Sequence, residues 1–280
     1  MSFYKLIALS FVLVIVGCNK RGSGRDAEPS DPSMYRLSEI RSAFTNSDQD
    51  EIYTINYNTD NQVSEIKWVF RAPGGTGANP STIEHTVTFS LTYQNNLAVQ
   101  CIRKAEQEIK TITYQYDGNR VRSKLIKSNM GPQIDSTIYH YGPDGKPTEV
   151  FTYHNDRFTS RVVFTYTNDV TTIVTYVNEF SGETKAKFEY AGYDSNTNFM
   201  RAITGLPALP GVTDFPFTRD VSLSPNNHKN QKAYSHVGIN DEFKTPWLNL
   251  NISYEYNNAG LPTIMKLMGG QYFFRYHIIR

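Results

Sequence analysis

The sequence has little cysteine, no excess of charge of one sign and no long apolar run beyond its first residues. It carries two cysteines in 280 residues, and its 28 Lys and Arg nearly balance its 27 Asp and Glu. Balanced charge argues against nucleic acid as a partner, because nucleic acid is bound through an excess of basic side chains. After Val16, no stretch approaches the roughly 18 consecutive apolar residues of a transmembrane helix.

The chain begins with a pattern typical of a secretion signal that ends at a cysteine. An apolar run extends from Leu6 to Val16 behind the single cation Lys5. At about 1.5 Å per residue, a helix of this length cannot cross a hydrocarbon core of ~30 Å, so the run is interpreted as a signal h-region. The segment 15–18, Ile-Val-Gly-Cys, resembles the bacterial lipobox. This resemblance implies cleavage after residue 17 and acylation of Cys18.

Acyl chains on Cys18 would anchor the chain stably, because more than one buried chain is sufficient without a transmembrane helix. The membrane, reached through these N-terminal acyl chains, is therefore an expected partner. The alternative is an ordinary secretion signal in which Cys18 occurs by chance. With Cys18 acylated, Cys101 has no cysteine left to pair with, so no disulfide framework or cysteine metal site is expected.

Three regions follow from this pattern: a signal peptide at residues 1–17, a tether at 18–33 and one domain at 34–280. The tether is rich in Gly, Ser, Pro and charge and has no periodic apolar positions. Such a segment cannot bury enough surface to offset its ordering entropy. The remaining residues are enough for a sizeable core in one β domain.

The domain is built from a repeated hairpin unit. Each unit is an alternating run that ends in Tyr, a turn of Asn, Asp or Gly, and a second alternating run. The tyrosines that close the units recur every 23 to 25 residues, at Tyr93, Tyr116, Tyr141, Tyr166 and Tyr190. Alternation places apolar and polar side chains on opposite faces of a strand, which is typical of antiparallel sheets.

These units predict an all-β fold, an extended antiparallel meander of hairpin repeats that forms a large curved sheet. A lone hairpin is marginally stable, so each unit should pair with the next along the chain. Whether the sheet is folded over or partly closed stays open at this point. Residues 35–44 are expected to be a strand rather than a short helix. Residues 195–250 break the rhythm and are expected to form an irregular but packed excursion.

Several motifs resemble those of uncharacterised lipoproteins from Bacteroides and related bacteria. These are the lipobox, "YEYNNAGLPTIM" at 254–265, "YDSNTNF" at 193–199 and "LSPNN" at 223–227. The units also resemble, more loosely, the tyrosine–aspartate repeats of large bacterial shell-forming proteins. The family has no assigned biochemistry, and some descriptions of it are porin-like. The resemblance therefore implies an envelope location and no particular activity.

No motif indicates catalysis, a cofactor or a metal site. The glycine-rich stretch at 72–80 lacks the Lys-Ser/Thr of a phosphate loop. Asp194, Asn196 and Asn198 have the spacing of the first ligands of a calcium loop, but its glycine and glutamate positions are occupied by Phe199 and Gly205. An Asx-rich turn is therefore preferred to a calcium site. If Thr148 pairs with Tyr141 across the hairpin, His140 faces Glu149, which explains that histidine as a cross-strand pair.

Aromatic side chains are the best sequence candidates for ligand binding. Trp68 and Trp247 could stack on a sugar ring, although alternation favours a core or sheet role for most aromatic residues. The primary hypothesis is a lipid-anchored, non-enzymatic protein of the outer membrane, facing the periplasm or the cell surface. Its sheet would act as a binding or scaffolding surface. The alternatives are a glycan- or peptide-capture lipoprotein with a pocket formed by residues 195–250, and a porin-like membrane barrel.

Overall fold

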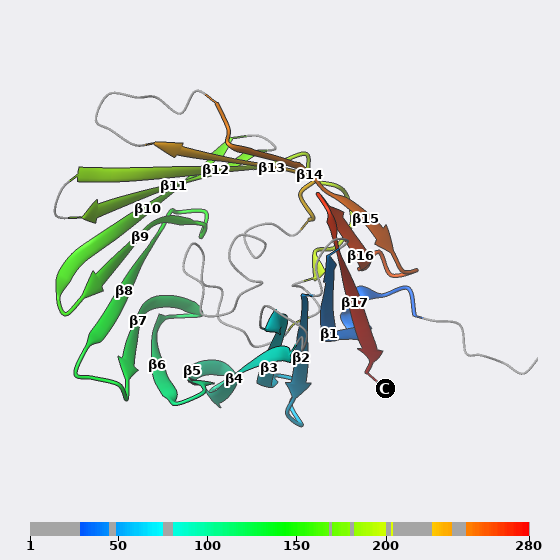
Figure 1. Cartoon of the computed structure of the whole chain (residues 1–280), viewed down its shortest axis with the longest axis horizontal. Helices are drawn as coiled ribbons and strands as arrows, with labels where there is room; N and C mark the ends of the chain where they lie inside the picture. Colours follow the sequence, from blue (N-terminus) through cyan, green and yellow to red (C-terminus); the bar gives the residue numbers. More distant parts are fainter. Residues whose placement is uncertain are drawn as a thin grey trace, which may run out of the picture.

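The fold is a single antiparallel sheet that curls into a barrel (Figure 1). The computed structural model describes residues 29–44, 49–74, 81–167, 170–179, 182–199, 203, 226–236 and 245–279. A short 3-10 helix, η1 (Pro32–Met34), precedes the first strand. The strands are β1 (Tyr35–Phe44), β2 (Asp50–Tyr57), β3 (Val63–Gly74), β4 (Ser81–Gln94), β5 (Leu97–Ala105), β6 (Glu108–Asp117), β7 (Arg120–Ser128), β8 (Ile134–Tyr141), β9 (Pro147–His154), β10 (Arg157–Thr167), β11 (Val170–Glu179), β12 (Gly182–Ala191), β13 (Asn230–His236), β14 (Leu248–Asn251), β15 (Ser253–Tyr256), β16 (Pro262–Leu267) and β17 (Gly270–Ile278).

The predicted meander is confirmed. Each strand from β1 to β13 pairs antiparallel with the next, β15 pairs with β16 and β16 with β17. The first and last strands also meet, because β1 pairs with β17 from Tyr35↔Ile278 to Phe44↔Gly270. Residues 35–44 form the predicted strand. β13 and all of β14 except Asn251 lie inside the segment 195–250, so part of that segment belongs to the barrel wall.

One seam in the barrel is not sealed by a ladder. β14 and β15 follow each other in the chain and are separated only by Ile252. β14 pairs with β13 on one side, whereas β15 pairs with β16 on the other. Among the described residues no ladder joins β14 to β15. The continuous segment 248–256 therefore pairs with β13 in its first half and with β16 in its second half.

The inner face of the barrel holds the buried hydrophobic cluster, whereas the outer face carries most of the charged side chains together with some exposed apolar ones. The buried hydrophobic cluster draws on almost every strand, with Ile66, Phe89, Ile112 and Val150 at 0–1% exposure. Each of these residues is paired across the ladder with another buried or partly buried residue on the same face, as in Ile55↔Ile66 and Tyr139↔Val150. Sheet alternation therefore places the charged residues between them on the outside.

Five hairpins carry an extra residue at the same place, directly after their turn. The ladder register shifts beside Tyr57, Tyr93, Tyr116, Tyr141 and Tyr256. In the hairpin of the sequence "YHYGPDGKPTE", Tyr141 pairs with Pro147 and His140 pairs with Glu149. The expected Thr148–Tyr141 pair is therefore wrong, because Thr148 is the extra residue of a β-bulge, while the His140–Glu149 pair is confirmed. A bulge leaves nearby main-chain groups without ladder partners.

A tyrosine hydroxyl satisfies the main-chain oxygen that these bulges leave exposed. Tyr116 on β6 donates to the oxygen of Ala98 on β5, the residue just before the extra one. The β5–β6 ladder itself ends at Gln100↔Thr113, short of Ala98. Equivalent bonds of 2.6–3.0 Å join Tyr57 to Leu37, Tyr93 to Val63, Tyr141 to Val121, Tyr166 to Pro147 and Tyr276 to Pro262.

These tyrosines gather at one end of the barrel, here called the tyrosine end, because alternate turns of a meander lie at the same end. The opposite end, here called the mouth, carries the turns at 106–107, 129–133, 155–156 and 268–269. Among the described residues, no helix is long and apolar enough to cross a membrane. Cys18, the signal peptide and most of the tether lie outside the described residues.

We expect Tyr116→Phe to lower the free energy of unfolding by about 1–3 kcal/mol, because the main-chain carbonyl of Ala98 loses the hydroxyl that donates to it. Urea unfolding followed by tryptophan fluorescence measures the change. Tyr153→Phe is the matched control, since Val150 is buried on the inner face and alternation places Tyr153 on the outer face. Equal losses in the two variants would contradict the role given to the hydroxyl.

The same bonds predict sensitivity to base. Burial raises the pKa of Tyr116 and of Tyr141 to about 12, whereas an unfolded tyrosine titrates near ~10. Because the pKa is higher in the folded state, these tyrosines contribute their full stabilisation below pH ~10. The contribution is lost as the pH rises through the pKa of the folded groups. Denaturant unfolding at pH 8, 10 and 11 should show a decline that begins above ~10. A constant midpoint across this range would contradict it.

Candidate functional site

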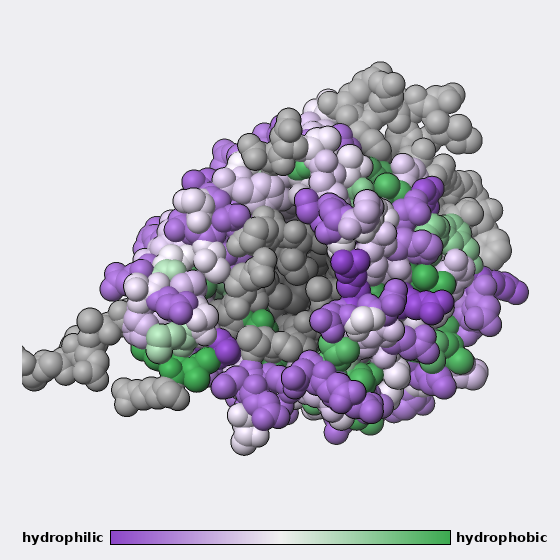
Figure 2. Space-filling model, turned by 180° about the vertical axis from the view of Figure 1, so that it is seen from behind, coloured by the Kyte–Doolittle hydropathy of each residue, from purple (hydrophilic) through white to green (hydrophobic). Residues whose placement is uncertain are grey.

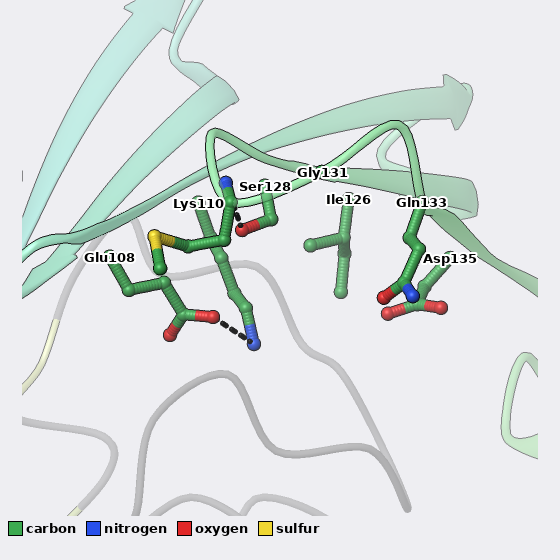
Figure 3. A pocket seen from close by; sticks show the side chains of 8 residues that line it. Glu108, Lys110, Ile126, Ser128, Gly131, Gln133 and Asp135 are labelled. Carbon is green, nitrogen blue, oxygen red and sulfur yellow. Dashed lines mark hydrogen bonds and ion pairs between the residues drawn. The ribbon is translucent and has the colours of Figure 1, made fainter.

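A polar cavity opens on the inner face near the mouth. It has a volume of about 150 Å³ and is lined by Glu108, Lys110, Ile126, Ser128, Met130, Gly131, Gln133 and Asp135. These residues come from β6, β7, β8 and the turn between the last two. Figure 3 shows the Glu108–Lys110 pair on one side of Ile126, with Gln133 and Asp135 on the other. The cavity therefore has a charged wall on each side of an apolar floor.

One wall is an ion-pair network centred on Glu108. Its carboxylate contacts Arg103 Nη1 at 2.7 Å and Lys110 Nζ at 3.2 Å. Partial burial would raise the pKa of Glu108, but the hydrogen bonds from Lys110 and Arg103 outweigh it and the pKa is lowered. Glu108 is therefore ionised at neutral pH, and two cations for one anion leave this wall with a positive excess.

The other wall carries a second charged pair. Asp135 Oδ1 lies 2.6 Å from His154 Nδ1, across the β8–β9 ladder. The second ring nitrogen of His154 lies 3.3 Å from Asn155 Nδ2. An Asp–His pair becomes a catalytic arrangement when the other nitrogen faces a nucleophile. Here that nitrogen contacts the side-chain amide of Asn155.

A second cluster lies at the tyrosine end, where the motifs "YDSNTNF", "LSPNN" and "YEYNNAGLPTIM" meet. Thr197 forms an isolated bridge with Asn226, and Asn226 Nδ2 donates to the oxygen of Asn196. The Tyr256 hydroxyl donates to Asp194 Oδ2. The structure thus brings together three segments that the sequence singled out separately. We call them the Asp194 cluster.

The carboxylate of Asp194 is used inside the Asp194 cluster. Its Oδ1 accepts the main-chain N–H of Asn196 at 3.0 Å, which is an Asx turn, and that of Asn227 at 3.3 Å. The described residues hold no group of three or more His, Cys, Asp or Glu side chains arranged for a metal ion. The hydrogen bond from Asn196 N–H to Asp194 Oδ1 forms the Asx turn that the sequence favoured at this position.

The Asp194 cluster also fixes a buried histidine. His228 is 6% exposed and its ring meets Tyr190 edge-on, with centroids 5.0 Å apart. Burial lowers the pKa of His228 to about 4, so the ring is neutral at physiological pH. The Tyr254 hydroxyl donates to the main-chain oxygen of His228 at 3.0 Å. These contacts tie the chain between β12 and β13 to β15 and identify the cluster as structural.

The two tryptophans do not form a common site. Trp68 is partly buried on the inner face of β3, where its ring stacks on Tyr53 with centroids 6.0 Å apart and planes 2° apart. Trp247 precedes β14 and is 63% exposed. β3 and β14 are not neighbours in the sheet, and Figure 1 shows them on different sides of the barrel. Neither residue lines the mouth cavity.

Sequence reasoning missed the residues of the mouth cavity and an aromatic group on the outer face. Phe158 is 39% exposed, and its ring lies 6.4 Å from Phe151 and 6.0 Å from Tyr153. Alternation alone would have placed Phe151 and Tyr153 inside. The bulge at Thr148 shifts the face of every later residue in β9 and turns them outward. The sequence did contain one signal for the mouth cavity: Lys, Glu and Asp recur near turns at positions that alternation places on the inner face.

Comparison with known proteins supports the fold and leaves the family open. No family model matches the chain, and no curated protein matches it. A crystal structure of a porin-like protein from Bacteroides uniformis is similar, with a TM-score of 0.57 and 13% sequence identity. The likeness covers 89% of this chain and 99% of that one. The barrel-like sheet and this neighbour together fit a membrane or envelope β protein.

Proposed function

We propose that the protein is a lipid-anchored, non-enzymatic envelope protein whose barrel wall faces water and whose mouth binds a ligand. The observation that carries the proposal is the distribution of charge between the two faces. Ion pairs lie between neighbouring strands on the outer face, including Arg41–Asp50 at 3.3 Å and Arg275–Glu39 at 3.1 Å. Arg161–Glu149 and Lys266–Glu255 are two more.

A lipid-facing wall would have the opposite pattern. Membrane barrels present an apolar band of about 25 Å to lipid, and one Arg or Lys at its midplane costs about 2–4 kcal/mol. On β10, Arg161 precedes the buried Val162 and therefore points to the outer face. On β12, Lys187 and Glu189 also point outward and form an ion pair of 2.6 Å. Figure 2 looks onto an end of the barrel, where the described residues are mostly hydrophilic with scattered hydrophobic patches.

Acyl chains on Cys18 would hold such a barrel at the membrane without inserting it. The described chain begins at Pro29, whose oxygen accepts the Tyr35 hydroxyl at 2.8 Å, and β1 starts at the tyrosine end. A tether from Cys18 therefore enters the barrel at the tyrosine end. This arrangement leaves the mouth at the end remote from the anchor, facing the periplasm or the cell surface.

A porin-like membrane barrel is the second candidate, favoured by the description of the structural neighbour. The two candidates are separated by replacing residues 1–18 with an ordinary cleavable secretion signal. We expect the resulting protein to fractionate as a soluble monomer without detergent, because its outer face carries ion pairs. The unaltered chain, as control, should stay with the membrane. Retention of the altered chain in the membrane, released only by detergent, would establish the membrane barrel instead.

The mouth cavity favours a small ligand that carries both charges. Lys110 offers a cation on one wall, with Arg103 behind it on Glu108, and Asp135 offers an anion on the other wall. None of the described residues that line the cavity is aromatic. Sugars are usually held by an aromatic face, whereas an amino acid or the end of a peptide brings a carboxylate and an ammonium group. We therefore propose a free amino acid or peptide end as the ligand of the mouth.

A thermal-shift panel of free amino acids and dipeptides, with neutral monosaccharides for comparison, tests the mouth. We expect some zwitterions to raise the melting temperature and the monosaccharides to leave it unchanged. Lys110→Met and Asp135→Asn should each abolish the shift. Lys127→Met is the control, because Lys127 is exposed on β7, the strand between those of Lys110 and Asp135, and alternates with the cavity residues Ile126 and Ser128. A shift that survives both mouth variants would place the ligand elsewhere.

A further inference from the structure

At the seam of the barrel, a short stretch of main chain has no ladder partner among the described residues on one side. The Ile252 N–H donates to the oxygen of Lys229 at 2.8 Å, so Ile252 directs its main-chain groups towards β13. Orientation alternates along a strand, and Leu250 and Leu248 therefore also face β13. Asn249 and Asn251 direct their N–H and C=O groups to the opposite side.

That opposite side is covered only next to β15. β16 pairs with Ser253 through Tyr256 and ends at Leu267, where the chain turns into β17. If the β15–β16 register continued beyond Ser253↔Lys266, Asn251 would lie opposite Met268, which belongs to the turn between β16 and β17. Within the described part of the chain, no hydrogen bond to the main chain of Asn249 or Asn251 is formed on this side. These four main-chain groups are called the open edge.

Apolar side chains stand at both ends of the open edge. Trp247 is 63% exposed and Met268 is 76% exposed, which makes Met268 the most exposed large apolar residue described. Trp247 lies directly before β14, and its N–H is held by the oxygen of Ala233 at 2.9 Å. The ring is therefore fixed at its main chain while its surface stays in water. Natural edges are usually blunted by charge or proline, and Asn249 and Asn251 are neither.

We propose that the open edge is a docking site for an extended peptide segment of a partner protein, which adds a strand beside β14. Main-chain donors and acceptors at strand spacing are complemented by another peptide main chain, which neither a sugar nor a lipid supplies. The guest would lie antiparallel to β14, in line with β16 and beyond its end at Leu267. An apolar guest side chain on the outer face would pack on Trp247.

The inference is independent of the mouth ligand, because it uses main-chain groups of β14 and none of the cavity residues. It gives Trp247 a role that the sequence could not define. The expected side-chain preference is alternating, with an apolar residue on the outer face at the position next to Trp247. Two residues of edge offer at most four hydrogen bonds, so a single site should bind weakly and exchange rapidly.

Proline substitution separates the open edge from the rest of the strand. Asn249→Pro removes an N–H that points to the open edge, whereas the ladder from Leu248 and Leu250 to β13 keeps all its groups. Asn249→Ala is the matched control, because it removes the side chain and keeps the N–H. The probe is a pool of fluorescein-labelled octapeptides of alternating Thr and Val, Leu or Phe, followed by anisotropy with the full-length protein.

We expect saturable binding to the unaltered protein and to Asn249→Ala. Asn249→Pro should weaken binding about tenfold, as expected for one lost hydrogen bond of about 1.4 kcal/mol. Trp247→Ala, an exposed change that leaves the ladder intact, should also weaken it and should remove the preference for Leu or Phe over Thr. N-methylation at alternate residues removes the N–H groups that the guest would donate to the open edge. Peptides methylated at those residues should therefore not bind.

Three outcomes would overturn the proposal. They are an absence of saturable binding across the pool, equal affinity in Asn249→Pro and Asn249→Ala, and equal affinity of N-methylated and unmodified peptides. A dimer that forms with rising protein concentration and disappears in Asn249→Pro would assign the open edge to a second copy of this chain instead. Variants of Lys110 and Asp135 should leave peptide anisotropy unchanged, which separates this site from the mouth.

Discussion

The hydrogen bond from a tyrosine hydroxyl to the main-chain oxygen beside a bulge is the interaction on which the barrel depends. In each hairpin the extra residue ends a ladder early and would leave a buried carbonyl without a donor. Tyr116 and its equivalents restore that bond from the neighbouring strand at 2.6–3.0 Å. An unsatisfied buried carbonyl costs more than an ordinary hydrogen bond contributes. The repeat of tyrosine and the repeat of bulges therefore depend on each other.

The bulges also decide which side chains face the interior, and this was the limit of what could be predicted from the sequence. Alternation, turn residues and the tyrosine period were sufficient for the all-β meander and for its strand order. The expected Asn, Asp and Gly turn residues adopt the left-handed conformation, for example Gly118 at φ +58°. The bulges were not, because an extra residue is stabilised by a tyrosine on another strand. Lys124 is consequently 1% exposed on the inner face.

The candidate site followed the same division. The motifs of the Asp194 cluster were visible in the sequence, but only tertiary structure shows that they meet and that Asp194 is held by main-chain N–H groups. The mouth cavity was not predicted, since its residues come from three strands and the facing of one of them, β7, depends on the bulge at Arg122. Trp68 was chosen for its chemistry and packs against the core. Trp247 became informative only when the end of β16 at Leu267 was known.

Chemical labelling of neighbouring residues on β7 tests the central claim, that a bulge sets the facing of each strand. Lys124→Cys and Leu125→Cys would each be exposed to a charged maleimide in the folded protein, where the native Cys101 is fully buried. The bulge predicts rapid labelling at position 125 and protection at position 124 until the protein is unfolded. Rapid labelling at 124 with protection at 125 would mean simple alternation from Val121, and would contradict the account.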